Sequence, residues 1–175
     1  GNTHLIQGLY DAHRNGAKVL ALASHIPSRQ IGSKFFQETH PEAIFQECSG
    51  YCEMVNSAEQ GGVVLHHAIQ STMAGNGVSV LVIPGDVSMQ DAEDDSFVES
   101  KISAGRPVVF PDPAEAAALT QAINEAESVA FFVGAGAKNA REQVLQLAEK
   151  VKAPIGHALG GKMYIQYDNP FDVGM

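Results

Sequence analysis

Apolar residues recur along this chain with spacings that predict helices alternating with buried strands. Continuous apolar runs at residues 18–24, 78–83 and 128–133 predict strands that are buried on both faces. Shorter strands are predicted at residues 51–55 and 154–159, and helices at residues 2–15, 41–48, 57–74, 113–125 and 138–151. This order predicts an α/β fold class, with parallel sheets covered by helices.

The predicted helix ends carry residue types that start or stop a helix. Asn2 and Thr3 are good N-cap residues for the first helix, and the pair Asn15-Gly16 suits its end. Asn56 or Ser57 is expected to cap the third helix, since a polar side chain there can accept from the first free backbone N–H groups.

The composition changes after residue 87, where an acidic stretch has little hydrophobic periodicity. This stretch contains Gly105-Arg106-Pro107 and Pro111-Asp112-Pro113, which indicates a solvated interdomain linker rather than a metal site. The predicted division is therefore residues 1–87, a linker at 88–112, and residues 113–175. Pro113 after Asp112 is expected to begin a helix. Because both ends of the chain fall at unusual places for an α/β domain, we expect a piece of a longer protein.

Charge and cysteine content narrow the function classes. The net charge of −9 argues against a nucleic-acid surface. No apolar run approaches the ~20 residues that a bilayer-spanning helix needs. Cys48 and Cys52 are expected to be two free thiols, since residues one helical turn apart rarely have disulfide geometry. A zinc site would need further ligands, and His40 is the only nearby candidate.

Two segments could carry chemistry. Gly134-Ala135-Gly136 joins a predicted strand to a predicted helix, where backbone amides can approach a phosphate, although two glycines also suit a simple chain reversal. Phe36, Gln37 and Glu38 follow the strand at 18–24, at the end of which open α/β sheets build their sites. These three residues either line a pocket or form a loop that Phe36 anchors in the core.

The chain resembles the thiamine-diphosphate (ThDP) dependent pyruvate oxidase family, and within it the ubiquinone-linked pyruvate oxidases, also called quinone-dependent pyruvate dehydrogenases. The matching segments run in order along almost the whole chain outside the linker. They include Asp11–Asn15, His25–Pro27, Ile31-Gly32, Phe36–Pro41, Glu47-Cys48, Gly77–Val80, Pro84–Val87, Lys152–Ile155, His157–Leu159, Gly161-Lys162 and Tyr167–Met175.

The resemblance implies a place for each part of the chain. Residues 1–87 resemble the C-terminal half of a ThDP pyrimidine-binding domain. Residues 113–175 resemble the start of a central, Rossmann-like domain that binds FAD. By the same resemblance, the family's ThDP-activating glutamate and its magnesium-binding motif lie outside this chain, so no metal ligand is expected within it and the chain alone is expected to be inactive.

The function that the resemblance implies is oxidative decarboxylation of pyruvate to acetate and CO2. ThDP, FAD and Mg2+ would be the cofactors of the parent enzyme, and a quinone would accept the electrons. A homo-oligomer, either dimer or tetramer, is expected, with a cytoplasmic location or peripheral contact with the inner membrane through a tail that some relatives carry. The alternatives are an acetohydroxyacid synthase, a non-oxidative 2-keto acid decarboxylase, or a non-catalytic binding domain.

The resemblance also assigns site residues. Gln37, Phe36 and Glu38 are the candidate catalytic residues, with Phe36 near the reacting carbon, Gln37 bonding the aminopyrimidine or the intermediate, and Glu38 ordering the loop. The candidate cofactor-binding residues are Asn2, Gln37, Gly134, Gly136 and Gly161.

Overall fold

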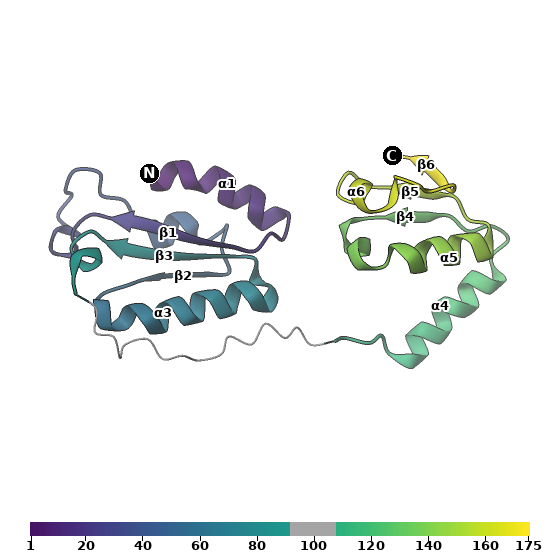
Figure 1. Ribbon diagram of the computed structural model, residues 1–175, viewed down its shortest axis with the longest axis horizontal. Coiled ribbons are helices and arrows are strands. Elements are labelled where there is room, and N and C mark those ends of the chain that lie inside the picture. The colour runs from purple at the N-terminus through teal and green to yellow at the C-terminus, as the bar shows by residue number, and fades with distance from the viewer. Residues whose placement is uncertain (92–107) are drawn as a thin grey trace. The chain divides into compact units, whose positions relative to one another are not determined.

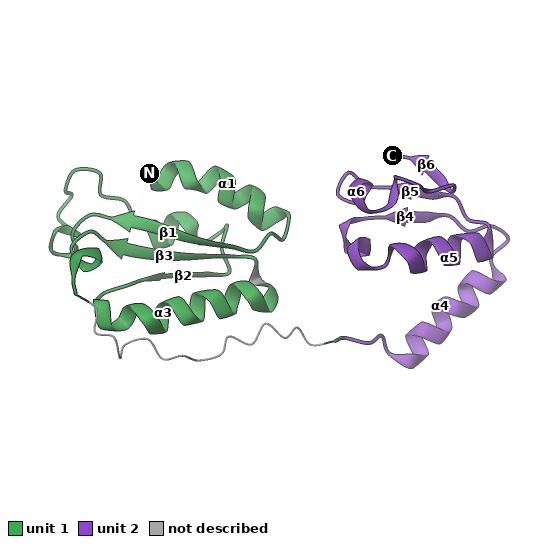
Figure 2. Cartoon of the chain, viewed as in Figure 1, with its two compact units in different colours: residues 1–108 green, residues 109–175 purple. Residues whose placement is uncertain are grey.

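The computed structural model describes residues 1–91 and 108–175, which form two compact units, residues 1–108 and 109–175 (Figure 2). Both units contain parallel strands and helices, so the predicted α/β class with parallel sheets is confirmed (Figure 1). The predicted linker at 88–112 falls largely on residues 92–107, which lie outside the described residues. Its boundaries therefore stay a prediction.

The first unit is a three-stranded parallel sheet between helices. Its strands lie in the order β1-β3-β2. The elements are α1 (Asn2–Arg14), β1 (Val19–His25), α2 (Pro41–Phe45), β2 (Tyr51–Met54), α3 (Ala58–Ser71) and β3 (Val78–Pro84), with 3-10 turns at Ser28–Gln30 and Val87–Met89 and a π turn at Thr72–Asn76.

Strand β3 supplies apolar residues to both faces of this sheet. Val80 and its alternate neighbours pack into a cluster with Leu9 of α1 and Phe45 of α2. Leu81 points to the opposite cluster, which contains Val64 of α3. Helices α1 and α3 accordingly lie on opposite sides of the sheet (Figure 1). Strands that are buried on both faces in this way read as the continuous apolar run seen in the sequence.

Some of the helix ends predicted from the sequence are confirmed and others are wrong. Ser57 caps α3 by accepting a hydrogen bond from the Gln60 N–H, and Gly16 follows α1 with φ +62°. The predicted cap of α1 is wrong, because Gly1 is the N-cap and makes no side-chain bond. Helix α3 ends before residue 74, since the chain widens into the π turn where the buried Thr72 hydroxyl meets Ser79 at 2.8 Å.

The second unit is also a three-stranded parallel sheet, in the order β4-β5-β6. Its elements are α4 (Pro113–Glu125), β4 (Phe131–Val133), a 3-10 turn at Ala135–Asn139, α5 (Arg141–Val151), β5 (Ile155–His157), α6 (Lys162–Ile165) and β6 (Asp172–Gly174). Its core contains Val133, Ala148, Ile155 and Ile165.

Several predicted bounds shift in this unit. Asp112 caps α4 by accepting from the Ala114 N–H at 2.8 Å, as the Asp-Pro pair indicates. The helix predicted from residue 138 begins at Arg141, because a 3-10 turn follows Gly134. Helix α6 and strand β6 are too short to show periodicity and were not predicted. No helix in the described ranges is long and apolar enough to cross a membrane.

Candidate functional site

A pocket of about 630 Å³ lies at the carboxyl end of β1 in the first unit. Leu5 and Leu22 give it apolar surface, and its polar groups include two residues predicted from the sequence, Asn2 and Gln37. The remaining lining residues are Gly1, Thr3, Ser24, His25, Ile26 and Thr39. A concave site with apolar surface and a few convergent polar groups, at the end of a parallel strand, suits a small ligand.

Asn2 and Gln37 reach this pocket from different elements. The Asn2 amide donates to the Ser24 carbonyl at 3.0 Å, which ties the start of α1 to the end of β1. Gln37 lies in the segment between β1 and α2, and its φ of +63° places it in the left-handed region that few non-glycine residues adopt. A strained backbone at a pocket-lining residue is typical of a functional site.

Phe36 does not anchor the loop in the core. Its side chain is 77% exposed, so the structural alternative of the sequence analysis is wrong on this point. The ring is also not among the residues that line the pocket of its own unit. Its predicted place beside the reacting carbon stays a prediction that depends on groups supplied by another subunit.

Glu38 orders the loop that carries Gln37. One carboxylate oxygen accepts from the Gly32 N–H and the other from the Phe35 N–H at 3.1 Å. The hydrogen bond from Gly32 is the largest cause that lowers the pKa of Glu38 below its ordinary value. Because backbone donors occupy both oxygens, the geometry favours a positioning role over proton transfer for this side chain.

The three predicted glycines of the second unit fall into two kinds. A Cβ on Gly134 or Gly136 would meet no atom within 4 Å, so their backbone is open to an incoming group. A Cβ on Gly161 would lie 2.2 Å from the Val133 carbonyl oxygen and 3.1 Å from the Gly134 Cα. Gly161 is therefore needed for backbone packing of the loop before α6 on the end of β4.

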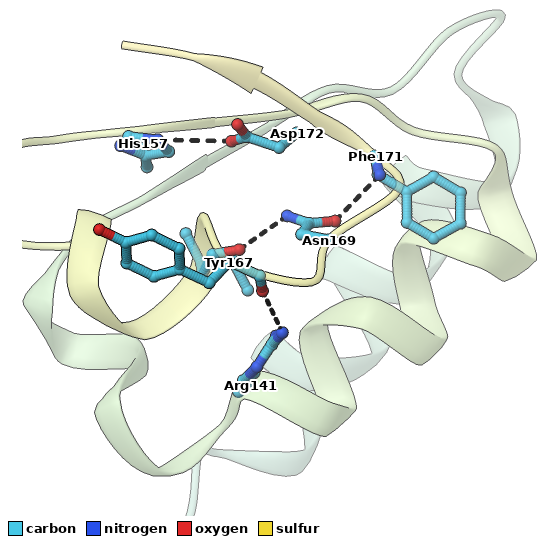
Figure 3. A network of polar contacts seen from close by, with 7 residues as sticks. Arg141, His157, Tyr167, Asn169, Phe171 and Asp172 are labelled. Carbon is cyan, nitrogen blue, oxygen red and sulfur yellow. Dashed lines mark hydrogen bonds and ion pairs between the residues drawn. The ribbon is translucent and has the colours of Figure 1, made fainter.

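A buried histidine and carboxylate in the second unit escaped the sequence reasoning. His157 is 1% exposed, and its Nε2 lies 3.3 Å from Asp172 Oδ1 (Figure 3). This contact lacks the orientation of a hydrogen bond, and within the described part of the chain His157 Nδ1 also has no hydrogen-bond partner. Asp172 belongs to β6, so only the unpredicted strand could have revealed the pair.

A polar network holds the segment that leads into β6. The Arg141 guanidinium donates to the carbonyl oxygens of Tyr167 and Asp168, in the latter case at 3.2 Å. Asn169 donates to the Ile165 carbonyl and accepts from the Phe171 N–H, each at 2.9 Å (Figure 3). These bonds satisfy backbone groups in the irregular segment between α6 and β6. They thereby hold the segment that brings Asp172 close to His157.

The two cysteines are free, as expected, but they do not share a helix. Cys48 follows α2 and is fully buried, while Cys52 belongs to β2. Burial is the main cause that raises the pKa of Cys52 to about 11, with further contributions from the Glu42 and Glu53 carboxylates. Across residues 1–91 and 108–175, no three His, Cys, Asp or Glu side chains gather as metal ligands.

Comparison with known proteins gives a family match within the second unit. Residues 116–175 match the family model described as thiamine pyrophosphate enzyme, central domain. The whole chain is 48% identical to an uncharacterized 42.6 kDa protein from the isoamylase 3′ region of Pseudomonas amyloderamosa, and spans 44% of that protein. The match thus extends through both units.

Two further relatives have names that refer to thiamine pyrophosphate or to pyruvate oxidase. Over 99% of its length the chain is 30% identical to the putative thiamine pyrophosphate-containing protein YdaP of Bacillus subtilis, covering 30% of it. Over 89% of its length it is 31% identical to the pyruvate oxidase of Lactiplantibacillus plantarum, covering 26% of that enzyme. Acetolactate synthases match at 24–26% identity. The chain spans less than half the length of these relatives.

The close backbone packing at Gly161 predicts a large loss of stability on substitution. Gly161→Ala is expected to lower the free energy of unfolding of the second unit by about 2 kcal/mol or more, since the clash is with backbone. Gly136→Ala is the matched control, because its Cβ meets nothing. Denaturant unfolding of both variants measures the difference, and equal stabilities would contradict the packing role.

The raised pKa of Cys52 predicts slow alkylation at neutral pH. Thiolate is the reacting form, and burial favours the neutral thiol, so the iodoacetamide rate should keep rising with pH toward about 11. The measurement uses Cys48→Ala so that only Cys52 reacts. A rate that levels off near the ordinary thiol pKa of about 8.5 would show that Cys52 is not desolvated.

Proposed function

We propose, because residues 116–175 match the family model described as thiamine pyrophosphate enzyme, central domain, that this chain is part of a ThDP-dependent pyruvate oxidase. The parent enzyme converts pyruvate to acetate and CO2 with ThDP and FAD, and passes the electrons to a quinone. The observation that carries the proposal is the convergence of Asn2 and Gln37 on one pocket at the carboxyl end of a parallel strand. The similarity to the Lactiplantibacillus plantarum pyruvate oxidase supports it.

The residues of the first unit fit a thiamine ring. The pocket offers apolar surface from Leu5 and Leu22 and an amide from Gln37, which has both a donor and an acceptor for a polar ring. When bound, ThDP supplies the electron sink for decarboxylation of a 2-keto acid. Gln37 would hold and orient the reacting groups, and the Phe36 ring, 77% exposed in this chain, would contribute to the site across a subunit interface.

The glycine turn of the second unit fits a phosphate-bearing cofactor. Gly134 and Gly136 leave open space beside the backbone at the carboxyl end of β4. Backbone N–H groups that no side chain shields can approach a diphosphate closely. We assign this turn to the flavin, with Gly161 setting its shape from behind rather than touching the cofactor.

The proposal carries several further elements. Mg2+ would be bound by ligands outside this chain, and the parent would assemble as a homodimer or homotetramer. We also propose a cytoplasmic location, or peripheral contact with the inner membrane through a tail. The chain alone would be inactive, because each cofactor site needs groups from elsewhere.

An acetolactate synthase is the second candidate, because relatives with that name match the whole chain. The flavin separates the two functions. In the oxidase, pyruvate reduces the flavin and bleaches its absorbance, whereas the synthase forms a carbon–carbon bond without net flavin reduction. Anaerobic mixing of the full-length protein with pyruvate tests this, and an unbleached flavin with acetolactate as product would replace the oxidase proposal.

The assignment of Gln37 predicts a slower reaction when its amide is removed. In the full-length enzyme, Gln37→Ala should slow flavin reduction by pyruvate about tenfold or more, as for one lost oriented hydrogen bond. Stopped-flow absorbance gives the rate. Gln30→Ala, in the same segment but outside the pocket, is the matched control and should react normally. An unchanged rate in Gln37→Ala removes this residue from the mechanism.

The assignment of the glycine turn predicts loss of flavin without loss of fold. Gly136→Val adds a side chain into space that is free in this chain, so the second unit should keep its stability. The purified full-length variant should nevertheless contain less than about a tenth of the native flavin, because the side chain occupies the cofactor's approach. Flavin absorbance per protein measures this, and a full complement of flavin would refute the assignment.

A further inference from the structure

We propose that Asp86, at the carboxyl end of β3, is a positioning residue that holds the Gln37 segment in place by binding Ser28. Only the part of this inference that is tested by flavin reduction rests on the proposed function. The segment in question is residues 26–39, between β1 and α2.

The segment has little secondary structure of its own. It contains one 3-10 turn, Ser28–Gln30, and its internal hydrogen bonds join residues that are near neighbours in sequence. Examples are the Ser33 N–H to the Gln30 carbonyl at 3.2 Å and the Glu38 N–H to the Phe35 carbonyl at 2.9 Å. Local bonds of this kind shape a loop, but they do not fix it relative to the sheet.

Asp86 makes the connection to the sheet. Its Oδ1 accepts from the Ser28 N–H at 2.7 Å and its Oδ2 accepts from the Ser28 hydroxyl at 2.5 Å. Among the described residues these are the only long-range hydrogen bonds to the segment. The neighbouring Gly85 N–H donates to the His25 carbonyl at 3.1 Å, so the same turn also holds the end of β1.

Asp86 is itself anchored firmly. It lies two residues after the last residue of β3, Pro84, and β3 is the most buried strand of the first unit. The Ser88 hydroxyl donates to the Gly85 carbonyl at 2.8 Å, and the Gln90 side chain accepts from the Ala58 N–H at 3.0 Å at the start of α3. A carboxylate whose own turn is held by such bonds can fix the position of the segment that it binds.

The segment needs such a hold because it is strained. Lys34 has φ +60° and Gln37 has φ +63°, and non-glycine residues persist in this region only where their surroundings over-determine it. Glu38 closes the inner part of the loop on Gly32 and Phe35. Asp86 fixes the outer end at Ser28, so the two carboxylates together set where the Gln37 amide lies in the pocket.

The Asp86 carboxylate is committed to this contact. Both of its oxygens accept from Ser28, and the Ser28 hydroxyl is the largest cause that lowers the pKa of Asp86 below its ordinary value. It belongs to no group of three or more metal-binding side chains in the described part of the chain. These observations favour positioning over metal binding.

Hydrogen exchange in the full-length protein tests the hold without any assay of activity. Asp86→Asn should speed exchange of the residue 28–39 amides by about tenfold or more, while the β3 amides keep their protection. Ser28→Ala, which leaves Asp86 intact, should give a smaller increase in the same amides. Asp11→Asn is the control, since the Asp11 carboxylate accepts from the Asn15 side chain at the end of α1 and, within the described residues, bonds nothing in the 26–39 segment. Unchanged exchange in both Asp86→Asn and Ser28→Ala overturns the proposal.

A double-mutant cycle tests whether Asp86 acts through Gln37. Asp86→Asn should slow flavin reduction about tenfold in the native background but less than twofold in Gln37→Ala. Equal slowing in both backgrounds would mean that Asp86 acts by another route, and overturns the proposal. If the native protein does not oxidise pyruvate, the proposed function fails, and the exchange data alone decide on Asp86.

Discussion

The arrangement of the first unit depends on the burial of β3 between two strands and two layers of helix. Its alternating side chains serve both cores, with Val80 on the α1 side and Leu81 on the α3 side. A shift of one residue in register would exchange these faces and leave both cores unfilled. The position of β3 therefore also determines where its carboxyl end emerges, and with it the turn at Gly85 and Asp86 that meets the end of β1.

Those parts of the fold that depend on local sequence could be predicted. The apolar run of β3 and the Asp-Pro start of α4 each carry a signal within a few residues, because burial and capping act over that range. The π turn at Thr72 has no such local pattern, and its Thr72 hydroxyl is bonded to Ser79 of the following strand, β3. Strand β6 could not be predicted either, since it is too short for a pattern and forms by pairing with β5, after a segment that Arg141 holds.

In the candidate site, too, features set by local sequence could be predicted and features set by long-range contacts could not. Gln37 was predicted, and it does line a pocket together with Asn2, which the sequence alone could not place beside it. The bond from Asp86 to Ser28 joins residues 58 positions apart, so nothing in either neighbourhood indicates it. Gly161 was predicted as a cofactor contact, but the structure gives a packing reason for the glycine that only the three-dimensional approach to β4 could show.

The contact at Gly161 has a mechanical consequence. No side chain separates its backbone from Val133 and Gly134, so the two segments have no soft layer between them. Protein interiors resist compression, and here the resistance acts between main chains. A displacement of the glycine turn at Gly134 is thereby transmitted directly to the first residue of α6, Lys162. A change in the shape of the glycine turn would therefore require the start of α6 to move with it, because no space is left between the two segments.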